Sequence, residues 1–293
     1  MIFEYISVMN VNNNKALKLP SAHLDVKMMA FDLDDTLLNH ELKITPKTLE
    51  ALQNAAGRGI YIVLCSGRME YGILPHVRTL DIAGMEAGRY IIAMNGSSIF
   101  DLHSRQQVFS RKVPEEVLLE IYREAQARGL PAQVYFPDII YANVDDEWTR
   151  LDAKLCGVKL EAVEDFEGFM KGGHAKMLVP GEPEILKSFE KELKSKFSDR
   201  AEIFTSKPFF LEIMPKNAGK GQALAELANR LGISLENVMC FGDSYNDESM
   251  MRTAALSVCM SNGKEDLKEI CRYVTRFDNN NDGIADFLNS WVL

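Results

Sequence analysis

The sequence predicts an α/β fold, in which a doubly wound parallel sheet is interrupted by an inserted second α/β domain. Short apolar runs alternate with amphipathic helical segments, a pattern typical of parallel sheets with helices on both faces. Between residues 97 and 208 the alternation continues with more polar and more varied segments. The runs that we expect to form buried strands of the main sheet are residues 26–31, 60–65, 90–94, 209–213, 238–241 and 256–260.

Helix boundaries are marked between several of these runs. Pro46 follows Thr45, and proline is favoured at the first position of a helix, so we expect a helix to begin there. Gly57 and Gly59 are the expected stop of this helix. A second helix is predicted for residues 223–231, because apolar residues recur there at helical spacing and Gly232 follows directly.

The stretch from residue 97 to residue 208 is too long for a loop inside one compact domain. It contains a polar hairpin-like segment at residues 99–113, an amphipathic helix at 114–128, a strand candidate at 132–136 and a further helix at 182–197. We therefore expect three parts. They are an N-terminal extension (residues 1–26), a core (residues 27–96 and 209–293) and an inserted α/β domain (residues 97–208).

Composition excludes several classes of protein. Of 293 residues, 46% are hydrophobic and 26% are charged, as expected for a globular protein with a substantial core. The net charge of -9 disfavours a nucleic-acid partner, because binding to a polyanion needs a basic surface. No apolar run approaches the roughly 18 residues that span a bilayer, so we expect no membrane partner. The sequence predicts no oligomeric state.

The cysteines and the N-terminus indicate a cytoplasmic protein. Five cysteines form no CxxC pair and include an odd member, which suits a reducing compartment better than a disulfide framework. Residues 1–26 lack the basic start and sustained apolar region of a signal peptide. We assign this extension no function and expect it to have little structural weight.

An apolar strand runs directly into acidic residues in the segment MAFDLDDTLL, where Asp32 and Asp34 follow the strand. The ends of strands in α/β sheets point into the ligand crevice. A carboxylate can attack phosphorus when a cation neutralises the phosphate, while a second carboxylate transfers protons. Taken alone, the motif also fits an acidic turn after a buried strand.

A second acidic cluster makes a catalytic site the better interpretation. In VMCFGDSYNDESMM, Asp243 and Asp247 follow another predicted strand. Mg²⁺ prefers oxygen ligands and commonly takes one or two carboxylates together with phosphate and water. Acidic residues at neighbouring strand ends could therefore complete a magnesium site.

Two further segments offer groups that bind phosphate. The predicted strand at residues 60–65 ends in Ser66, Gly67 and Arg68, which provide a hydroxyl and backbone N–H groups. Lys220 opens a predicted helix in AGKGQAL and can supply positive charge. Each feature is common on its own, but their shared position at strand ends predicts one phosphate site.

On these motifs, together with NGSSIFD and NNNDGIADFL, the chain resembles the haloacid dehalogenase (HAD) superfamily, specifically its Cof-type, type IIB capped branch. The resemblance extends from residue 26 to the C-terminus. It implies a Rossmann-like core whose inserted α/β cap selects the substrate. It also implies a Mg²⁺-dependent phosphatase that hydrolyses a small phosphorylated metabolite, such as a sugar phosphate, through an aspartyl-phosphate.

The resemblance also assigns roles to residues. It implies that Asp32 is the nucleophile and a Mg²⁺ ligand, and that Asp34 is the general acid/base and binds the metal through its backbone carbonyl. Asp243 is an implied metal ligand, and Asp247 lies in or just outside that shell. The implied phosphate contacts are the Leu33 amide, Ser66, Gly67, Lys220 and Asn246.

Alternatives remain open at this stage. A phosphosugar mutase would use the same two carboxylates but return the phosphate to a sugar, and a non-catalytic metabolite-binding protein could keep the fold. Asp35 departs from the family pattern, since glycine is usual there, and Gly219 stands where a larger polar residue is common. DNNNDG resembles half of a calcium loop, but its twelfth position is Asn289 rather than glutamate, so we do not expect a calcium site.

Overall fold

A computed structural model describes residues 18–136 and 138–293 of the chain, and these residues form two sheets. The strands of the first sheet are β1 (Met28–Phe31), β2 (Tyr61–Cys65), β3 (Tyr90–Ala93), β4 (Ser98–Asp101), β5 (Gln106–Ser110), β12 (Val238–Gly242), β13 (Leu256–Cys259) and β14 (Tyr273–Val274). Their order is β14-β13-β12-β1-β2-β3-β4-β5. The strands from β14 to β3 are parallel, and β4 and β5 extend the edge as an antiparallel hairpin.

Side chains of the central strands alternate between two apolar clusters, one on each face of this sheet. Phe31 of β1 lies in one cluster and stacks on Phe241 of β12 with ring centroids 5.0 Å apart. Ala30 lies in the other. The first cluster includes side chains of α1 (Pro46–Gly57), α2 (Glu70–Leu80) and α10 (Gly283–Trp291), and the second those of α7 (Lys220–Leu231), α8 (Glu248–Thr253) and α9 (Glu265–Ile270). The prediction of a doubly wound sheet is confirmed.

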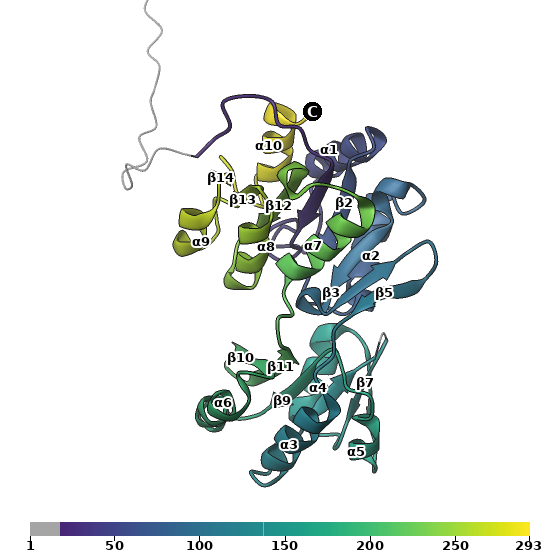
Figure 1. Cartoon of the computed structure of the whole chain (residues 1–293), viewed down its shortest axis with the longest axis vertical. Helices are drawn as coiled ribbons and strands as arrows, with labels where there is room; N and C mark the ends of the chain where they lie inside the picture. The colour runs from purple at the N-terminus through teal and green to yellow at the C-terminus, as the bar shows by residue number, and fades with distance from the viewer. Residues whose placement is uncertain (1–17, 137) are drawn as a thin grey trace, which may run out of the picture.

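The second sheet lies at the other end of the molecule (Figure 1). Its strands are β6 (Gln133–Tyr135), β7 (Ile139–Ala142), β8 (Lys159–Ala162), β9 (Met177–Pro180), β10 (Ala201–Lys207) and β11 (Phe210–Pro215), in the order β10-β11-β9-β6-β7-β8. The helices of this part are α3 (Glu115–Gln126), α4 (Glu147–Cys156), α5 (Phe166–Phe169) and α6 (Pro183–Phe197). Helices α3 and α6 share a third apolar cluster with the sheet.

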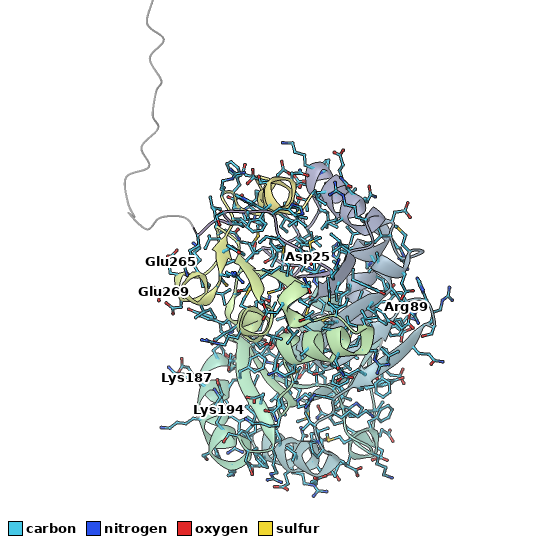
Figure 2. The ribbon with its side chains drawn as sticks, turned by 45° about the horizontal axis from the view of Figure 1, so that its top comes forward. Asp25, Arg89, Lys187, Lys194, Glu265 and Glu269 are labelled. Carbon is cyan, nitrogen blue, oxygen red and sulfur yellow. The ribbon has the colours of Figure 1, made fainter. Side chains whose placement is uncertain are left out.

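Helix α6 has one apolar face that packs in this part of the molecule and one polar face at the surface. Phe189 and Leu193 are buried on one side of the helix. Lys187 and Lys194 point outward at the molecular surface in Figure 2. This division is the amphipathic pattern from which the sequence predicted the helix. Among the described residues, no helix is both long and apolar enough to cross a bilayer.

The apolar run at residues 209–213 was expected in the parallel sheet, and that expectation is wrong. It forms β11, which pairs antiparallel with β9 and β10 in the second sheet. Every residue of β11 is buried, so its composition resembles that of a central parallel strand. The hairpin of β4 and β5 conversely belongs to the first sheet. We therefore propose that the inserted domain begins near residue 111 and ends near residue 216, instead of at residues 97 and 208.

The predicted N-terminal extension lies partly outside the described residues, which begin at Lys18. The part that is described makes specific contacts with the core. Lys18 Nζ donates to the carbonyl oxygens of Lys268, Glu269 and Cys271 at the end of α9. A cation is favourable there because the last carbonyls of a helix carry partial negative charge. Residues 18–26 therefore have more structural weight than the sequence suggested.

The close approach of α7 and α8 leads to a prediction about two helical glycines. A Cβ at Gly221 would lie 2.1 Å from the backbone oxygen of Ser249, whereas a Cβ at Gly57 would meet nothing within 4 Å. We expect Gly221→Ala to destabilise the protein by about 1–3 kcal/mol through overpacking. Gly57→Ala, the matched control, should be neutral or stabilise by up to about 1 kcal/mol. Urea unfolding of both variants measures this, and equal effects would contradict the packing argument.

Candidate active site

A buried ammonium group joins two of the predicted acidic residues. Asp32 directly follows β1, and Lys220 is the first residue of α7. Lys220 Nζ donates to Asp32 Oδ1 at 2.5 Å and to Asp247 Oδ1 at 2.6 Å. All three side chains are buried, so these ion pairs are poorly screened by solvent. Residues that are far apart in the sequence thus meet at the carboxyl ends of β1 and β12.

Asp247 also organises the backbone that carries Asp243. Its Oδ2 accepts hydrogen bonds from the amides of Asp243 at 3.0 Å and Ser244 at 3.1 Å. Asp243 Oδ1 accepts a hydrogen bond from Thr36 Oγ1 at 2.9 Å. Asp247 therefore has both oxygens in use, while Asp243 Oδ2 is not engaged by any described hydrogen-bond donor.

One carboxylate oxygen each of Asp32, Asp243 and Asp247 lies within 4.8 Å of the others. Three carboxylates thus share one site with a single ammonium, which binds two of them, so negative charge is in surplus. The donors are all oxygen atoms, the set preferred by a hard divalent cation such as Mg²⁺. The residues present at the strand ends therefore fit such an ion.

The pKa values of the site reflect this surplus of negative charge. Burial and the charge of Asp247 raise the pKa of Asp32 well above its usual value, and Lys220 offsets this only in part. Burial and Asp247 also raise the pKa of Asp243 to about 6. For Lys220, burial works to lower the pKa, but the carboxylates of Asp32 and Asp247 outweigh it and the pKa is raised.

Asp34 is held by Arg68, a residue whose side chain was given no role from the sequence. The Asp34 side chain is 50% exposed, and Arg68 binds both of its oxygens, with Nη2 2.5 Å from Oδ1 and Nε 3.0 Å from Oδ2. Arg68 also contacts His76, whose Nε2 lies 3.3 Å from Nη1 of Arg68. The position of Arg68 directly after Ser66 and Gly67 was the available signal for this role.

The predicted phosphate-binding groups lie around this cluster. Among the described residues, the backbone amides of Leu33 and Gly67 donate no hydrogen bond, so both are free to bind an anion. Ser66 Oγ accepts a hydrogen bond from the Arg68 amide at 3.1 Å. Asn246 is exposed in η4 (Tyr245–Asp247), next to Asp247. These groups follow the ends of β1, β2 and β12, which are neighbours in the sheet, and their individual roles stay predictions.

Asn95 is a second residue that sequence reasoning missed. It lies in a turn, η2 (Met94–Gly96), with φ 51°. Its backbone N–H donates to the backbone carbonyl oxygen of Ser66 at 3.0 Å. Its Oδ1 is buried and has no hydrogen-bond partner among the described residues. A Cβ at Gly67 would lie 3.0 Å from that atom. Asn95 thus packs directly on the predicted phosphate loop, and the only signal for it was the NG pair of NGSSIFD.

Comparison with known proteins places the chain in a family. The sequence profile of haloacid dehalogenase-like hydrolases matches residues 29–288. The chain therefore belongs to the haloacid dehalogenase-like hydrolase family, and the resemblance inferred from its motifs is confirmed.

Relatives with named activities align along nearly the whole chain. A 5-amino-6-(5-phospho-D-ribitylamino)uracil phosphatase of Bacillus subtilis is 30% identical over 289 residues, covering 90% of this chain and 97% of the relative. An HMP-PP phosphatase of Serratia proteamaculans is 25% identical over 269 residues, covering 91% and 95%. These relatives confirm the prediction of a phosphatase enzyme.

Solved structures show the same architecture. A haloacid dehalogenase-like hydrolase of Bacteroides thetaiotaomicron superposes with a TM-score of 0.82 at 30% identity and covers 90% of this chain and 99% of its own. A sugar phosphatase of HAD subclass IIB superposes with a TM-score of 0.74 at 26% identity, covering 90% and 98%. The predicted core with a cap is thereby confirmed as the fold.

The raised pKa of Asp243 predicts how stability depends on pH when no divalent cation is bound. A carboxyl with a usual value of 3.8 and a folded value of about 6 binds its proton more tightly in the folded state. Its stabilising contribution is therefore present below about pH 4 and lost as the pH rises through 6. With chelator present, we expect the thermal midpoint of the parent protein minus that of Asp243→Asn to fall as the pH rises through this window. A pH-independent difference between the two proteins would contradict the assignment.

Proposed function

We propose that this protein is a Mg²⁺-dependent phosphatase that hydrolyses a small phosphorylated metabolite through an aspartyl-phosphate on Asp32. The observation that carries the proposal is the convergence of Asp32, Asp243, Asp247 and Lys220 at the ends of β1 and β12, beside unused backbone amides. Bound Mg²⁺, held by Asp32, Asp243 and the backbone carbonyl of Asp34 with Asp247 in or beside its shell, would supply positive charge that lets an anionic nucleophile approach a phosphate.

In the first step, a carboxylate oxygen of Asp32 attacks phosphorus. The bond between phosphorus and the leaving oxygen breaks, and Asp34 gives that oxygen a proton. Lys220 and the amides of Leu33 and Gly67 stabilise the charge on the phosphoryl oxygens. In the second step, Asp34 takes a proton from water while the water oxygen attacks phosphorus, which releases phosphate and restores Asp32.

The substrate class follows from the relatives, which are named for phosphorylated small molecules. The subclass IIB sugar phosphatase supports sugar phosphates as a subset to test first. The test is to measure phosphate release from sugar phosphates, nucleotides and cofactor phosphates, with Mg²⁺ and with EDTA. Release of free phosphate that EDTA abolishes is expected. Transfer to another sugar hydroxyl would instead indicate a phosphosugar mutase, and no turnover of any compound would favour a binding protein.

Substitutions of Asp32 and Asp34, the two carboxylates that follow β1, should impair different steps of the reaction. Asp32→Asn removes the nucleophile, so we expect no phosphoenzyme. Asp34→Asn keeps the nucleophile but cannot activate water, so phosphoenzyme should form from an aryl phosphate and persist, with turnover reduced by about 10²- to 10⁴-fold. Rapid-quench labelling measures both outcomes. Normal phosphoenzyme in Asp32→Asn would remove Asp32 from its role.

We also propose that the inserted domain acts as a cap that selects the substrate. It joins the core through two chain connections, one between β5 and α3 and the other between β11 and α7. Hinged closure at these connections would exclude water from the site. Exchanging residues 111–216 with those of a relative should change the ranking of natural substrates, while turnover of a small aryl phosphate should change little. A ranking that stays with the core would contradict this prediction.

A further inference from the structure

The loop after Asp34 is held by side-chain amides from two segments near the other end of the chain. Asn262 Nδ2 donates to the backbone carbonyl oxygen of Asp35 at 2.7 Å, and Asn279 Nδ2 donates to the backbone carbonyl oxygen of Leu38 at 2.8 Å. Asn280 Oδ1 accepts from the His40 amide at 3.0 Å. Three hydrogen bonds thus fix the backbone of residues 35–40 from outside the loop.

The three asparagines also bind one another, and we call them the amide triad. The backbone N–H of Asn279 donates to Asn262 Oδ1 at 3.3 Å, and Asn280 Nδ2 donates to Asn279 Oδ1 at 3.1 Å. Asn279 is only 5% exposed, so its hydrogen bonds are shielded from water. The triad is therefore one connected network and not three separate surface contacts. It contains two residues of the NNNDGIADFL motif, for which the catalytic scheme gives no role.

Strain in the loop explains why such a network is needed. Asp35 has φ 61°, in the left-handed region, where residues other than glycine are disfavoured by of order 1 kcal/mol. Glycine, the usual residue of the family here, adopts this conformation freely. Asn262 binds the carbonyl of this strained residue, which directly follows Asp34. If that carbonyl were released, the strain could relax and the backbone of Asp34 would turn with it.

We propose that the amide triad is a positioning device for Asp34, which holds the strained Asp35 turn so that the acid/base carboxyl faces the phosphoryl site. The inference rests on the role proposed for Asp34. The Asp34 side chain is half exposed and is bound only by Arg68 among the described residues. Its direction therefore depends on its backbone as well as on that one partner.

The kinetics of p-nitrophenyl phosphate test the proposal. Formation of phosphoenzyme from this compound does not need a proton from Asp34, because its leaving group is already stable, whereas phosphoenzyme hydrolysis needs Asp34 as base. For Asn262→Ala we expect kcat to fall by about 5- to 10-fold, the size of one lost hydrogen bond, with kcat/KM unchanged within about 2-fold. A merely structural role would lower both constants together with the thermal midpoint.

Two further variants make the test specific. In an Asp35→Gly background the strain is absent, so Asn262→Ala should lower kcat by less than about 2-fold. Asn281→Ala is the matched control, because Asn281 is exposed and, within residues 18–136 and 138–293, its side chain binds only Asp278 in its own loop. It should leave kcat unchanged. Equal losses of kcat from Asn262→Ala in both backgrounds, or no loss in either, would overturn the proposal.

Hydrogen exchange separates failure of this proposal from failure of the proposed function. In Asn262→Ala and in Asn279→Ala we expect faster exchange of amides in residues 35–42 than in the parent protein, with the rest of the core unchanged. If the parent protein releases no phosphate from any compound, the proposed function fails whatever the exchange shows. If the parent is active and exchange in residues 35–42 is unaltered in both variants, the triad does not hold the loop and this inference fails.

Discussion

The active site is organised around one buried ammonium group. Lys220 is completely buried and binds Asp32 and Asp247 at 2.5 and 2.6 Å. A buried charge is tolerated only when it is paired, so each partner fixes the position of the others. This constraint joins the end of β1, the start of α7 and the loop after β12. Removing Lys220 would leave two buried carboxylates without their cation, which is a heavier cost than losing a surface ion pair.

The topology of the sheet brings these groups to one edge. Phe31 and Phe241 are paired in register on neighbouring parallel strands, and their rings stack beneath the site. The next residue along β1 is Asp32, and Asp243 follows β12 two residues after Phe241. Because parallel strands end at the same edge, hydrophobic pairing in the core sets the separation of the carboxylates above it. The apolar core and the polar site are therefore parts of one arrangement.

The same reasoning explains how much the sequence could predict. Asp32, Asp34, Asp243 and Lys220 were identified because each follows a clear strand or begins a clear helix, and strand ends meet by topology. The placement of residues 209–213 was wrong because burial on both faces looks alike in either sheet, and only pairing decides between them. The contact of the Arg68 side chain with Asp34 was missed because it depends on a side-chain direction that local sequence does not specify. The amides of Asn279 and Asn280 lie in a polar run that resembles a simple loop.

The surplus of carboxylates links the stability of the site to its chemistry. Three acids in one buried site cannot all be ionised without cost, and burial together with the neighbouring negative charge raises the pKa values of Asp32 and Asp243. Protons and a divalent cation would therefore compete for the same oxygens, because either one neutralises the charge. Only the deprotonated form leaves Asp32 able to attack phosphorus. Without a cation, the ionised carboxylates repel one another, and the same surplus of negative charge is what allows the site to bind a cation for catalysis. The ion pairs with Lys220 allow the fold to tolerate this repulsion.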